Sequence, residues 1–491
     1  MGGGIGRRGD PSVLKAGRLA GGIVPASEPL LDVEGGLERA LGRLEGKAVY
    51  ADLLAESSSG FRLRVERTAT TPTAQPRLRG ATFRAWTGER WAETVARNLE
   101  PEELDRAADL LAADLARSGG PGRPPPGSSP TGNLEFRTRS RRPLAEVPLA
   151  EQIELARSWF ATALEVPGVV DAYASVGCID NDRLFRSTSG ARRYQSISRV
   201  LGSVVPLASE NGRVEYDALT EGATGGFELF DRFTEDGIRA AARNAVELLG
   251  TGTPPAGRMA VLLDPSTAGT FAHESFGHGS EADQFLRDRS YLKPLFGQRL
   301  GPGGLTLVDD GAYPGAWGTL GFDDEGIPAQ RTVLVENGRF VEVLHDRESA
   351  AALGRRTTGN ARRADFLSRN FVRMTNTFVE PGEFGLDELV KEAGNGILLE
   401  RCTSGIEDPL GGQMQLKVKR ARRIEHGTLT EAYSGMALSG RVLDFLMAIR
   451  GIGRAEYFSI LPGLCGKGHT DLLPAGTGGS YLLSEAVVGP A

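Results

Sequence analysis

The chain has 491 residues, with 57 Lys and Arg against 63 Asp and Glu, so its formal net charge is -6 at pH 7. This length allows two or three domains, and the acidic balance argues against a general nucleic-acid-binding protein. No apolar run approaches the roughly 20 residues that span a bilayer, and the start lacks the apolar segment of a secretory signal, so we expect a cytoplasmic protein without membrane contact.

The first part of the chain predicts mixed helices and strands. Residues 1–35 are rich in Gly and Arg without sustained periodicity, which predicts a flexible extension. A helix is expected after Pro101, where apolar side chains recur on one face: Leu104, Ala108, Leu111 and Leu115. The Pro- and Gly-rich stretch 118–132 predicts a loop within this first domain.

The next part predicts a domain boundary near residue 250. Helices are expected over 148–164 and 235–249, and strands over 169–176 and 196–206. Gly250 ends the last helix and is followed by Thr251-Gly252-Thr253-Pro254-Pro255. We therefore expect an N-terminal α+β domain over 36–250 and a β-rich C-terminal domain over 258–491.

The second half predicts antiparallel β-sheets. Val333–Val341 reads as a strand, an Asn-Gly turn and a strand, and residues 421–432 repeat the pattern with His426-Gly427 at the turn. The basic run 417–423 alternates with apolar residues, which predicts the solvated face of a strand. His345 is expected to be exposed or satisfied in the core. The expected fold class is α+β, with the N-terminal domain packed on C-terminal antiparallel sheets that carry a metal-binding helix.

Two of the five histidines, His273 and His278, fall within six residues, and Glu274 follows the first. This pattern suggests a metal site. Residues at i and i+5 lie about 140° apart on a regular α-helix, too far round to share one ion. One π-type turn would bring them to the same side, and Gly277 would make the distortion easier because it has no Cβ. The alternative is an ordinary helix with one buried and one exposed histidine.

The residues before this motif predict how its helix begins. Met259–Leu263 is a short apolar run typical of a buried strand. Asp264 can then cap a helix, and Pro265 suits its first turn. The histidines would lie two to three turns into that helix.

A catalytic zinc ion takes three protein ligands and leaves a fourth position for water. The residues alone leave three candidates for the third ligand. Glu281 and Asp283 are close in sequence, but nearby acids more often hold a ligand in place or face solvent. Cys465 lies far downstream between glycines, which allow close backbone approach. The two other cysteines, Cys178 and Cys402, are expected to be buried thiols, and three distant cysteines predict no disulfide framework.

At these motifs the chain resembles the TldD/PmbA metallopeptidases, and specifically their zinc-binding TldD type. The resemblance covers roughly residues 170–485 and its motifs occur in order. They are His273-Glu274-x-x-x-His278, Gly279-x-Glu281-x-Asp283, Asp323-Asp324-Glu325-Gly326-Ile327-Pro328, Thr358-Gly359-Asn360-Ala361-Arg362-Arg363, Arg373-Met374-Thr375-Asn376-Thr377, Gly411-Gly412-Gln413 and Cys465-Gly466-Lys467.

The resemblance implies that His273, His278 and Cys465 bind zinc and that Glu274 is the catalytic base. Glu281, Asp283 and His469 are then candidates for residues around the site or its cavity. Zinc would polarise the scissile carbonyl and lower the pKa of its water from about 15.7 towards about 7. Glu274 would take that proton and pass it to the leaving amine.

The resemblance also implies a homodimer, or a heterodimer with a PmbA-type subunit, around an enclosed cavity that admits unfolded segments or small peptides. One alternative is an amide hydrolase that trims a peptide-like intermediate in a natural-product biosynthetic pathway. Another is a non-catalytic scaffold subunit, although the intact ligand set speaks against it. The sequence contains neither a phosphate-binding glycine loop in its strand-loop-helix context nor a Gly-x-Ser-x-Gly elbow.

Overall fold

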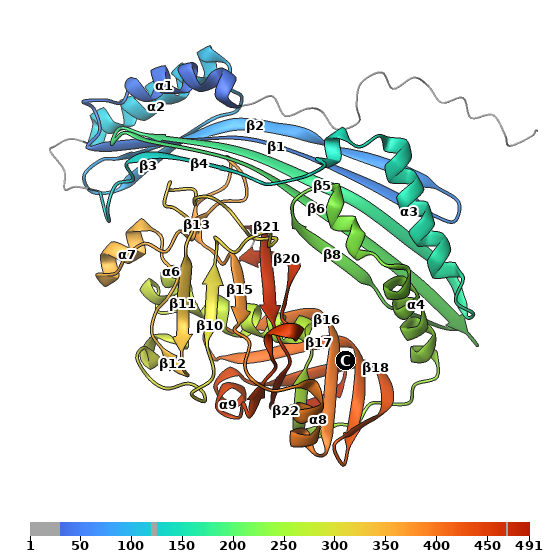
Figure 1. Cartoon of the computed structure of the whole chain (residues 1–491). Helices are drawn as coiled ribbons and strands as arrows, with labels where there is room; N and C mark the ends of the chain where they lie inside the picture. Colours follow the sequence, from blue (N-terminus) through green and yellow to red (C-terminus); the bar gives the residue numbers. More distant parts are fainter. Residues whose placement is uncertain (1–29, 119–124, 468–469) are drawn as a thin grey trace, which may run out of the picture.

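The computed structural model describes residues 30–118, 125–467 and 470–491, and it has an α+β fold. Long strands of an N-terminal sheet form a layer over a C-terminal half that is built on further sheets (Figure 1). None of the helices in the described ranges is long and apolar enough to cross a membrane.

The N-terminal sheet has the strand order β3-β2-β1-β5-β6-β4, and β7 and β8 also pair with β6. Its pairs are antiparallel except for β4 with β6. The strands are β1 (Tyr50–Glu66), β2 (Thr70–Trp86), β3 (Trp91–Ala96), β4 (Gly132–Arg137), β5 (Val169–Ser187), β6 (Ala191–Glu210), β7 (Arg213–Tyr216) and β8 (Leu219–Thr224).

Helices cover the two ends of this sheet (Figure 1). Helices α1 (Glu34–Gly42) and α2 (Pro101–Ser118) pack at one end, and α3 (Leu149–Leu164) and α4 (Glu235–Leu249) at the other. The apolar face predicted for α2 is buried, which confirms that helix. Short 3-10 helices complete this part: η1 (Leu30–Val33), η2 (Leu144–Glu146) and η3 (Phe227–Arg232).

The expected extension and loop are only partly described. Within the described residues, Leu30 is buried and starts η1, so structure is present a few residues before the expected limit of the extension at residue 35. Residues 1–29 lie outside the described part of the chain, as do 119–124 of the expected loop 118–132. Residues 125–131 carry no helix or strand, and β4 begins at Gly132.

The C-terminal half contains two six-stranded sheets and one two-stranded sheet. Their orders are β12-β11-β10-β15-β21-β20, β18-β17-β16-β9-β22-β19 and β13-β14. The expected antiparallel pairing holds for most neighbours, but β15 with β21 and β9 with β16 are parallel. Parallel neighbours need a long connection, and more than a hundred residues separate β9 from β16.

The elements of this half are β9 (Gly257–Leu263), α5 (Pro265–Thr270), η4 (Phe271–Gly277), η5 (His278–Ser280), α6 (Ala282–Leu286), η6 (Lys293–Leu295), β10 (Leu307–Asp310), β11 (Arg331–Glu336), β12 (Arg339–Phe340), α7 (Arg347–Leu353), β13 (Ala361–Arg362), β14 (Phe371–Val372), β15 (Asn376–Val379), α8 (Leu386–Ala393), β16 (Gly396–Glu407), β17 (Gln413–Glu425), β18 (Thr428–Arg441), α9 (Val442–Met447), β19 (Gly451–Ile452), η7 (Ala455–Tyr457), β20 (Ser459–Lys467), β21 (Thr470–Gly479) and β22 (Leu482–Pro490).

Both predicted hairpins are confirmed. Asn337 and Gly338 join β11 to β12 with φ of 48° and 80°, and His426 and Gly427 join β17 to β18 with φ of 49° and 71°. Two successive positive φ angles give the turn whose twist matches the flanking strands. His426 is therefore a turn residue.

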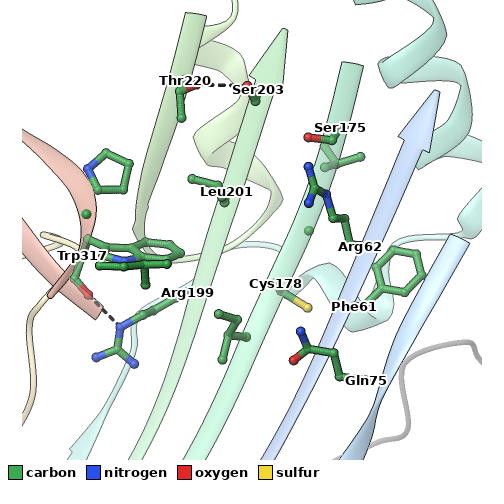
Figure 2. Close-up of a pocket in the computed structure, with 16 residues that line it drawn as sticks. Phe61, Arg62, Gln75, Ser175, Cys178, Arg199, Leu201, Ser203, Thr220 and Trp317 are labelled. Carbon is green, nitrogen blue, oxygen red and sulfur yellow. Dashed lines mark hydrogen bonds between the residues drawn. The ribbon is translucent and has the colours of Figure 1, made fainter. Parts of the chain in front are cut away.

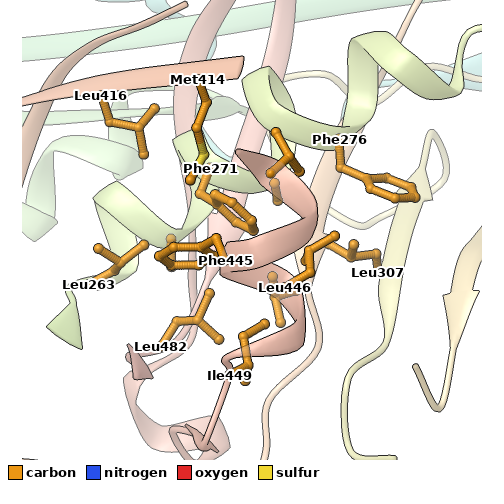
Figure 3. Packing of buried hydrophobic residues seen from close by; sticks show 14 of the residues in the cluster. Leu263, Phe271, Phe276, Leu307, Met414, Leu416, Phe445, Leu446, Ile449 and Leu482 are labelled. Atoms are coloured by element: carbon orange, nitrogen blue, oxygen red, sulfur yellow. The ribbon is translucent and has the colours of Figure 1, made fainter. Parts of the chain in front are cut away.

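The largest apolar core surrounds η4 (Figure 3). Phe271 and Phe276, from its two ends, are fully buried. The ring of Phe271 lies 4.4 Å from that of Phe445 on α9, and the ring of Phe276 lies 5.4 Å from that of Phe340 on β12. Because both ends of η4 are held by packed aromatic rings, the side chains between them have fixed positions.

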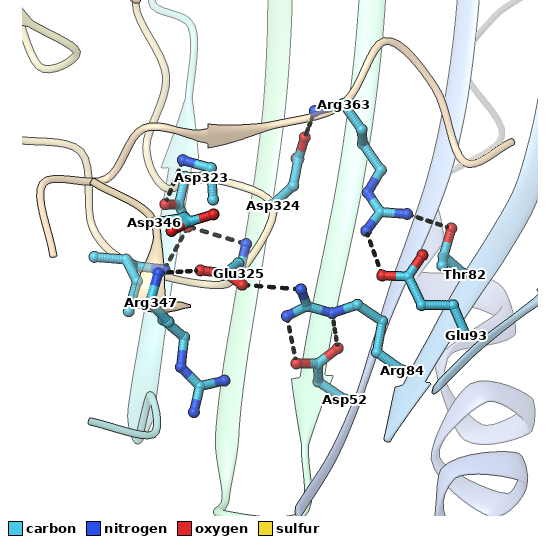
Figure 4. A network of polar contacts seen from close by, with 12 residues as sticks. Asp52, Thr82, Arg84, Glu93, Asp323, Asp324, Glu325, Asp346, Arg347 and Arg363 are labelled. Atoms are coloured by element: carbon cyan, nitrogen blue, oxygen red, sulfur yellow. Dashed lines mark hydrogen bonds and ion pairs between the residues drawn. The ribbon is translucent and has the colours of Figure 1, made fainter. Parts of the chain in front are cut away.

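Buried ion pairs join the N-terminal sheet to the C-terminal half (Figure 4). Arg84 on β2 donates to Asp52 on β1 at 2.8 and 3.0 Å and to Glu325 at 2.9 Å. Arg183 on β5 pairs with Asp324 in the same way. Asp323–Pro328, one of the motifs noted in the sequence, thus forms the loop that contacts the N-terminal sheet.

The basic run on β17 is exposed at Lys417 and Arg423, as expected of a solvated strand face, but two of its other residues also join the two halves. Lys419 pairs with Glu215 on β7 at 2.6 Å, and Arg420 pairs with Glu247 on α4 at 2.5 Å. Arg422 pairs instead with Glu400 on the neighbouring strand β16. Only part of the run therefore faces acids of the N-terminal part, and those long-range partners cannot be read from local alternation.

Candidate metal centre

The segment with the two histidines changes helix type where they occur. Asp264 caps α5 by accepting a hydrogen bond from the Thr267 amide at 2.8 Å, and Pro265 occupies the first turn. Helix α5 then continues as the π-helix η4, which confirms the π turn expected from the i, i+5 spacing. The wider turn places the His273 and His278 rings on one side, with centroids 5.3 Å apart.

Gly277 permits this arrangement for a reason other than backbone freedom. Its φ and ψ of -56° and -51° are ordinary helical values. A Cβ at this position would lie 1.9 Å from the Met374 sulfur. The glycine is therefore needed for the close approach of η4 to the segment that carries Met374.

Cys465 joins the two histidines from strand β20. Its Sγ lies 3.7 Å from His278 Nε2, and one ligand atom from each of the three residues lies within 4.8 Å of the others. Arg373 donates to the backbone carbonyl of Cys465 and so fixes the end of β20 beside η4. The structure thus brings together residues that are far apart in sequence.

The electrostatics favour the thiolate form of Cys465. Burial alone would raise the pKa of this thiol, but His273 and His278 outweigh that effect and hold the pKa well below its usual range. Burial likewise opposes protonation of His278, whereas Glu281 and Cys465 raise its pKa. A thiolate is the form in which cysteine binds metal.

The distance between two of the three side chains can be compared with that around a tetrahedral zinc ion. Zn–S and Zn–N bonds of about 2.3 and 2.05 Å at a tetrahedral angle separate sulfur and nitrogen by about 3.6 Å. The observed distance from Cys465 Sγ to His278 Nε2 is 3.7 Å. His273 Nδ1 is buried and has no hydrogen-bond partner in the described part of the chain. These residues fit zinc in number and donor type, and the distance between Cys465 and His278 fits its coordination.

Glu281 and Asp283 lie next to the cluster and are not part of it. Glu281 Oε2 is 3.5 Å from His278 Nδ1, the ring nitrogen that faces away from Cys465, and 2.8 Å from Lys467 Nζ. Asp283 Oδ1 contacts the same ammonium at 2.7 Å. Lys467 therefore ties the end of β20 to the segment after His278. A carboxylate on the outer nitrogen of a ligating histidine is the usual way to orient its ring.

The pKa values of Glu281 and Asp283 differ, although both carboxyls contact Lys467. Burial would raise the pKa of Glu281, but Lys467 and His278 lower it to about 2. Burial raises the pKa of Asp283 to about 6, against the effect of Lys467. Glu281 is thus the carboxylate that stays charged beside His278.

Glu274 lies on the open side of the cluster. Its side chain is 25% exposed, and its Oε2 lies 3.9 Å from His278 Nε2. It packs against Gly405 on β16, where a Cβ would approach Glu274 Cγ to 2.6 Å. Glu274 can therefore contact both a metal site and a solvent-accessible ligand.

Comparison with known proteins identifies relatives of this chain. A model of the C-terminal domain of PmbA/TldA metallopeptidases matches residues 256–488, and a model of their central domain matches residues 142–249. A metalloprotease of Methanothermobacter thermautotrophicus is 35% identical over 353 residues, which are 72% of this chain and 76% of the relative. The chain belongs to the TldD/PmbA family of metallopeptidases.

Other relatives extend the comparison. A zinc metalloprotease TldD homolog of Saccharolobus solfataricus is 32% identical over 241 residues, 49% of this chain and 53% of that protein. The crystal structure of TldE from Thermococcus kodakarensis has a TM-score of 0.72 at 16% identity, with 93% of this chain and 100% of that chain covered. The latter likeness concerns the fold alone.

One acidic residue beside the cluster of His273, His278 and Cys465 was not predicted from the sequence. Glu407, at the end of β16, has both carboxyl oxygens buried and without a hydrogen-bond partner in the described residues. Burial raises its pKa to about 9, although the nearby His278 opposes the rise. The sequence Glu407-Asp408-Pro409 resembles an ordinary turn, so it carried no signal.

The role of Lys467 was missed as well, although a signal existed. It lies two residues after Cys465, so a strand there places both side chains on the same face. Residues of the other family motifs form a hydrogen-bond network around Asp309. Asp309 accepts hydrogen bonds from Thr375 and Thr377 of the Arg373–Thr377 segment, and Asn360 donates to it at 2.8 Å.

The other histidines and cysteines lie away from the cluster. His345 is fully buried in the core, with Nδ1 3.2 Å from the Ser349 hydroxyl, whereas Nε2 lies 3.5 Å from Glu342 and has no hydrogen-bond partner among the described residues. Cys178 is buried as expected, but Cys402 is only partly buried. Burial raises the pKa of the Cys402 thiol to about 11. His469 lies outside the described residues.

Proposed function

We propose that this protein is a zinc-dependent peptidase in which His273, His278 and Cys465 hold the metal. The observation that carries the proposal is the convergence of these three side chains, with ligand atoms within 4.8 Å, beside the partly exposed Glu274. Membership of a metallopeptidase family supports the reaction class. The name of the Saccharolobus solfataricus relative supports zinc as the metal.

The chain's own residues divide the work. Bound zinc supplies a Lewis acid that polarises a carbonyl and acidifies water. Glu274 is the general base, because its carboxylate stands beside the ligands without belonging to their cluster and can transfer a proton to the leaving amine. Glu281 orients the His278 ring, and Arg373 holds the Cys465 backbone in place.

The substrates that we propose are unfolded or small peptides, cleaved inside an enclosed dimer cavity. The partner that we propose is a second copy of this chain or a PmbA-type chain. Large apolar side chains near the site also support a covered surface, since Ile406, Leu410 and Leu472 are 66%, 63% and 59% exposed. We propose a cytoplasmic location, where the thiols of Cys178, Cys402 and Cys465 stay reduced.

The test is to replace Glu274 with Gln and to measure zinc content and peptide hydrolysis on the same preparation. Glu274→Gln keeps the size of the side chain but cannot accept the proton, so we expect about one zinc per chain and a turnover lower by about 10² to 10⁴-fold. Glu102→Gln, on the exposed first turn of α2, is the matched control. Near-normal turnover would remove Glu274 from the role of base, and loss of zinc would make it a ligand.

A further inference from the structure

A cavity of about 500 Å³ lies between the N-terminal sheet and strand β20 (Figure 2). Residues of β1, β5, β6 and β8 form one wall, and Trp317 and Pro462–Leu464 form the other. Successive side chains of a strand point to opposite faces. Leu464 therefore lines this cavity, while Cys465 faces the histidines on the other side of β20. The cavity is thus a separate site from the metal cluster.

Much of the lining is apolar and open to the cavity. Ile179, Leu201, Trp317, Pro462 and Leu464 contribute to it. Leu201 and Leu464 remain 36% and 55% exposed, although both lie where two parts of the molecule meet. A volume of about 500 Å³ with an apolar wall is typical of a small-molecule or peptide side-chain pocket.

The charge of the lining is entirely positive. Arg62 and Arg199 line the cavity, and none of its lining residues is Asp or Glu. Arg199 is 5% exposed, and its Nε and Nη2 donate to the carbonyls of Trp317 and Thr319 at 2.7 and 3.0 Å (Figure 2). In the part of the chain that the structure describes, no carboxylate forms an ion pair with it.

A buried guanidinium without a counterion is unfavourable. Burial, together with the charges of Arg362 and Arg183, lowers the pKa of Arg199 to about 9. The two carbonyls hold Nε and Nη2, and Nη1 has no hydrogen-bond partner in the described residues. An anion in the cavity would supply the missing charge, and the planar guanidinium suits a carboxylate.

We propose that this cavity binds a carboxylate attached to an apolar side chain, as carried by the C-terminal residue of a peptide. Arg199, with Arg62 across the cavity, binds the carboxylate, and the wall of Leu201, Pro462 and Leu464 receives the side chain. The proposal does not depend on hydrolysis at the metal cluster, because the two sites occupy opposite faces of β20. It does specify the end of the peptide that the protein recognises.

The test compares small probes by titration calorimetry on the full chain. N-acetyl-L-leucine carries the carboxylate and the apolar side chain, and N-acetyl-L-leucinamide lacks the charge. We expect the acid to bind at least about tenfold more tightly than the amide, because it gains a charge-assisted hydrogen bond. Arg199→Gln should abolish this preference, whereas Arg117→Gln, 72% exposed on α2, should keep it.

A second variant and a second condition keep the test decisive if Arg199→Gln does not fold. Leu201→Ala should weaken binding of the acid about fivefold, because it removes part of the apolar wall. Protein stripped of metal with a chelator should bind the acid unchanged. Equal binding of acid and amide would overturn the proposal, as would loss of binding in the stripped protein, which would place the carboxylate on the metal.

Two further probes distinguish the source of the anion. Hexanoate has a carboxylate and an apolar chain but no peptide group, and we expect it to bind more weakly than N-acetyl-L-leucine. Equal or tighter binding of hexanoate would overturn the assignment to a peptide end. Inorganic phosphate should compete poorly, and effective competition would show that the arginines serve a phosphate group instead.

Discussion

Replacing Gly405 with Ala tests whether the position of Glu274 matters for catalysis. A Cβ at Gly405 would lie 2.6 Å from Glu274 Cγ and 3.0 Å from both Leu416 Cδ2 and Thr270 Cγ2. Non-bonded carbons are comfortable at about 3.5–4.0 Å, so the Glu274 side chain has to retreat by about 1 Å. A displacement of about 1 Å at a catalytic group can cost about 10²-fold in rate, or about 2.7 kcal/mol of barrier.

We therefore expect Gly405→Ala to lower kcat about 100-fold while zinc content stays near one per chain. The assay is hydrolysis of an unstructured peptide with metal analysis on the same sample. Gly440→Ala on β18 is the control, because a Cβ there meets nothing within 4 Å. The double variant Gly405→Ala/Glu274→Gln should be no slower than Glu274→Gln alone, because both changes act on the same carboxylate. Near-normal turnover of Gly405→Ala, or fully additive losses in the double variant, would refute the reasoning.

Three other outcomes are expected. Cys465→Ser should sharply lower zinc content, because a neutral hydroxyl replaces a thiolate, whereas Cys402→Ser should not; full zinc in Cys465→Ser would point to Glu281 or Asp283 as a ligand. Lys467→Met should weaken zinc binding about 10 to 100-fold in chelator competition, since it releases the carboxylate that orients His278, and exposed Lys47→Met should leave the affinity unchanged. Glu215→Gln should cost on the order of 1 kcal/mol at pH 7. Burial opposes the charged form of Glu215, but Lys419, Ser434 and Arg213 lower its pKa in the folded protein. The stabilisation by the Glu215 carboxylate is therefore present above about pH 4.3, the pKa of an unfolded Glu, and is lost as the pH falls through the lowered pKa of the folded protein. Urea unfolding at several pH values should show that the difference in unfolding free energy between Glu215→Gln and wild type becomes smaller in acid. A difference that stays constant with pH would contradict the role of the Glu215 carboxylate.

Local chemistry made the shape of the segment with the two histidines predictable. Asp264 and Pro265 mark the start of its helix, and the five-residue spacing of the histidines can serve one ion only with a wider turn. Spacing could not choose Cys465 over Glu281 and Asp283, because all three offer suitable donors. The choice came from the family resemblance, and the structure places the cysteine beside both histidines.

Long-range packing explains what the sequence could not reveal. Arg199 lies in an ordinary strand, and its unusual surroundings come from β1, β20 and the Trp317 loop, which are distant along the chain. The sequence around Glu407 is typical of a turn, and only the folded position of β16 brings this residue close to the histidines. The expected division into domains near residue 250 stays a prediction, although strands before and after it join different sheets.

The buried pairs of Arg84 with Glu325 and of Arg183 with Asp324 mean that the two halves cannot be treated as separate folding units. Removing one partner of a buried pair costs about 3–5 kcal/mol, and a whole domain is stable by only about 5–15 kcal/mol. A fragment of residues 257–491 produced alone would therefore expose Asp324 and Glu325, whose partners lie in the missing N-terminal sheet. A chain cut between residues 250 and 257 should instead remain one particle, its two pieces held by the same charges.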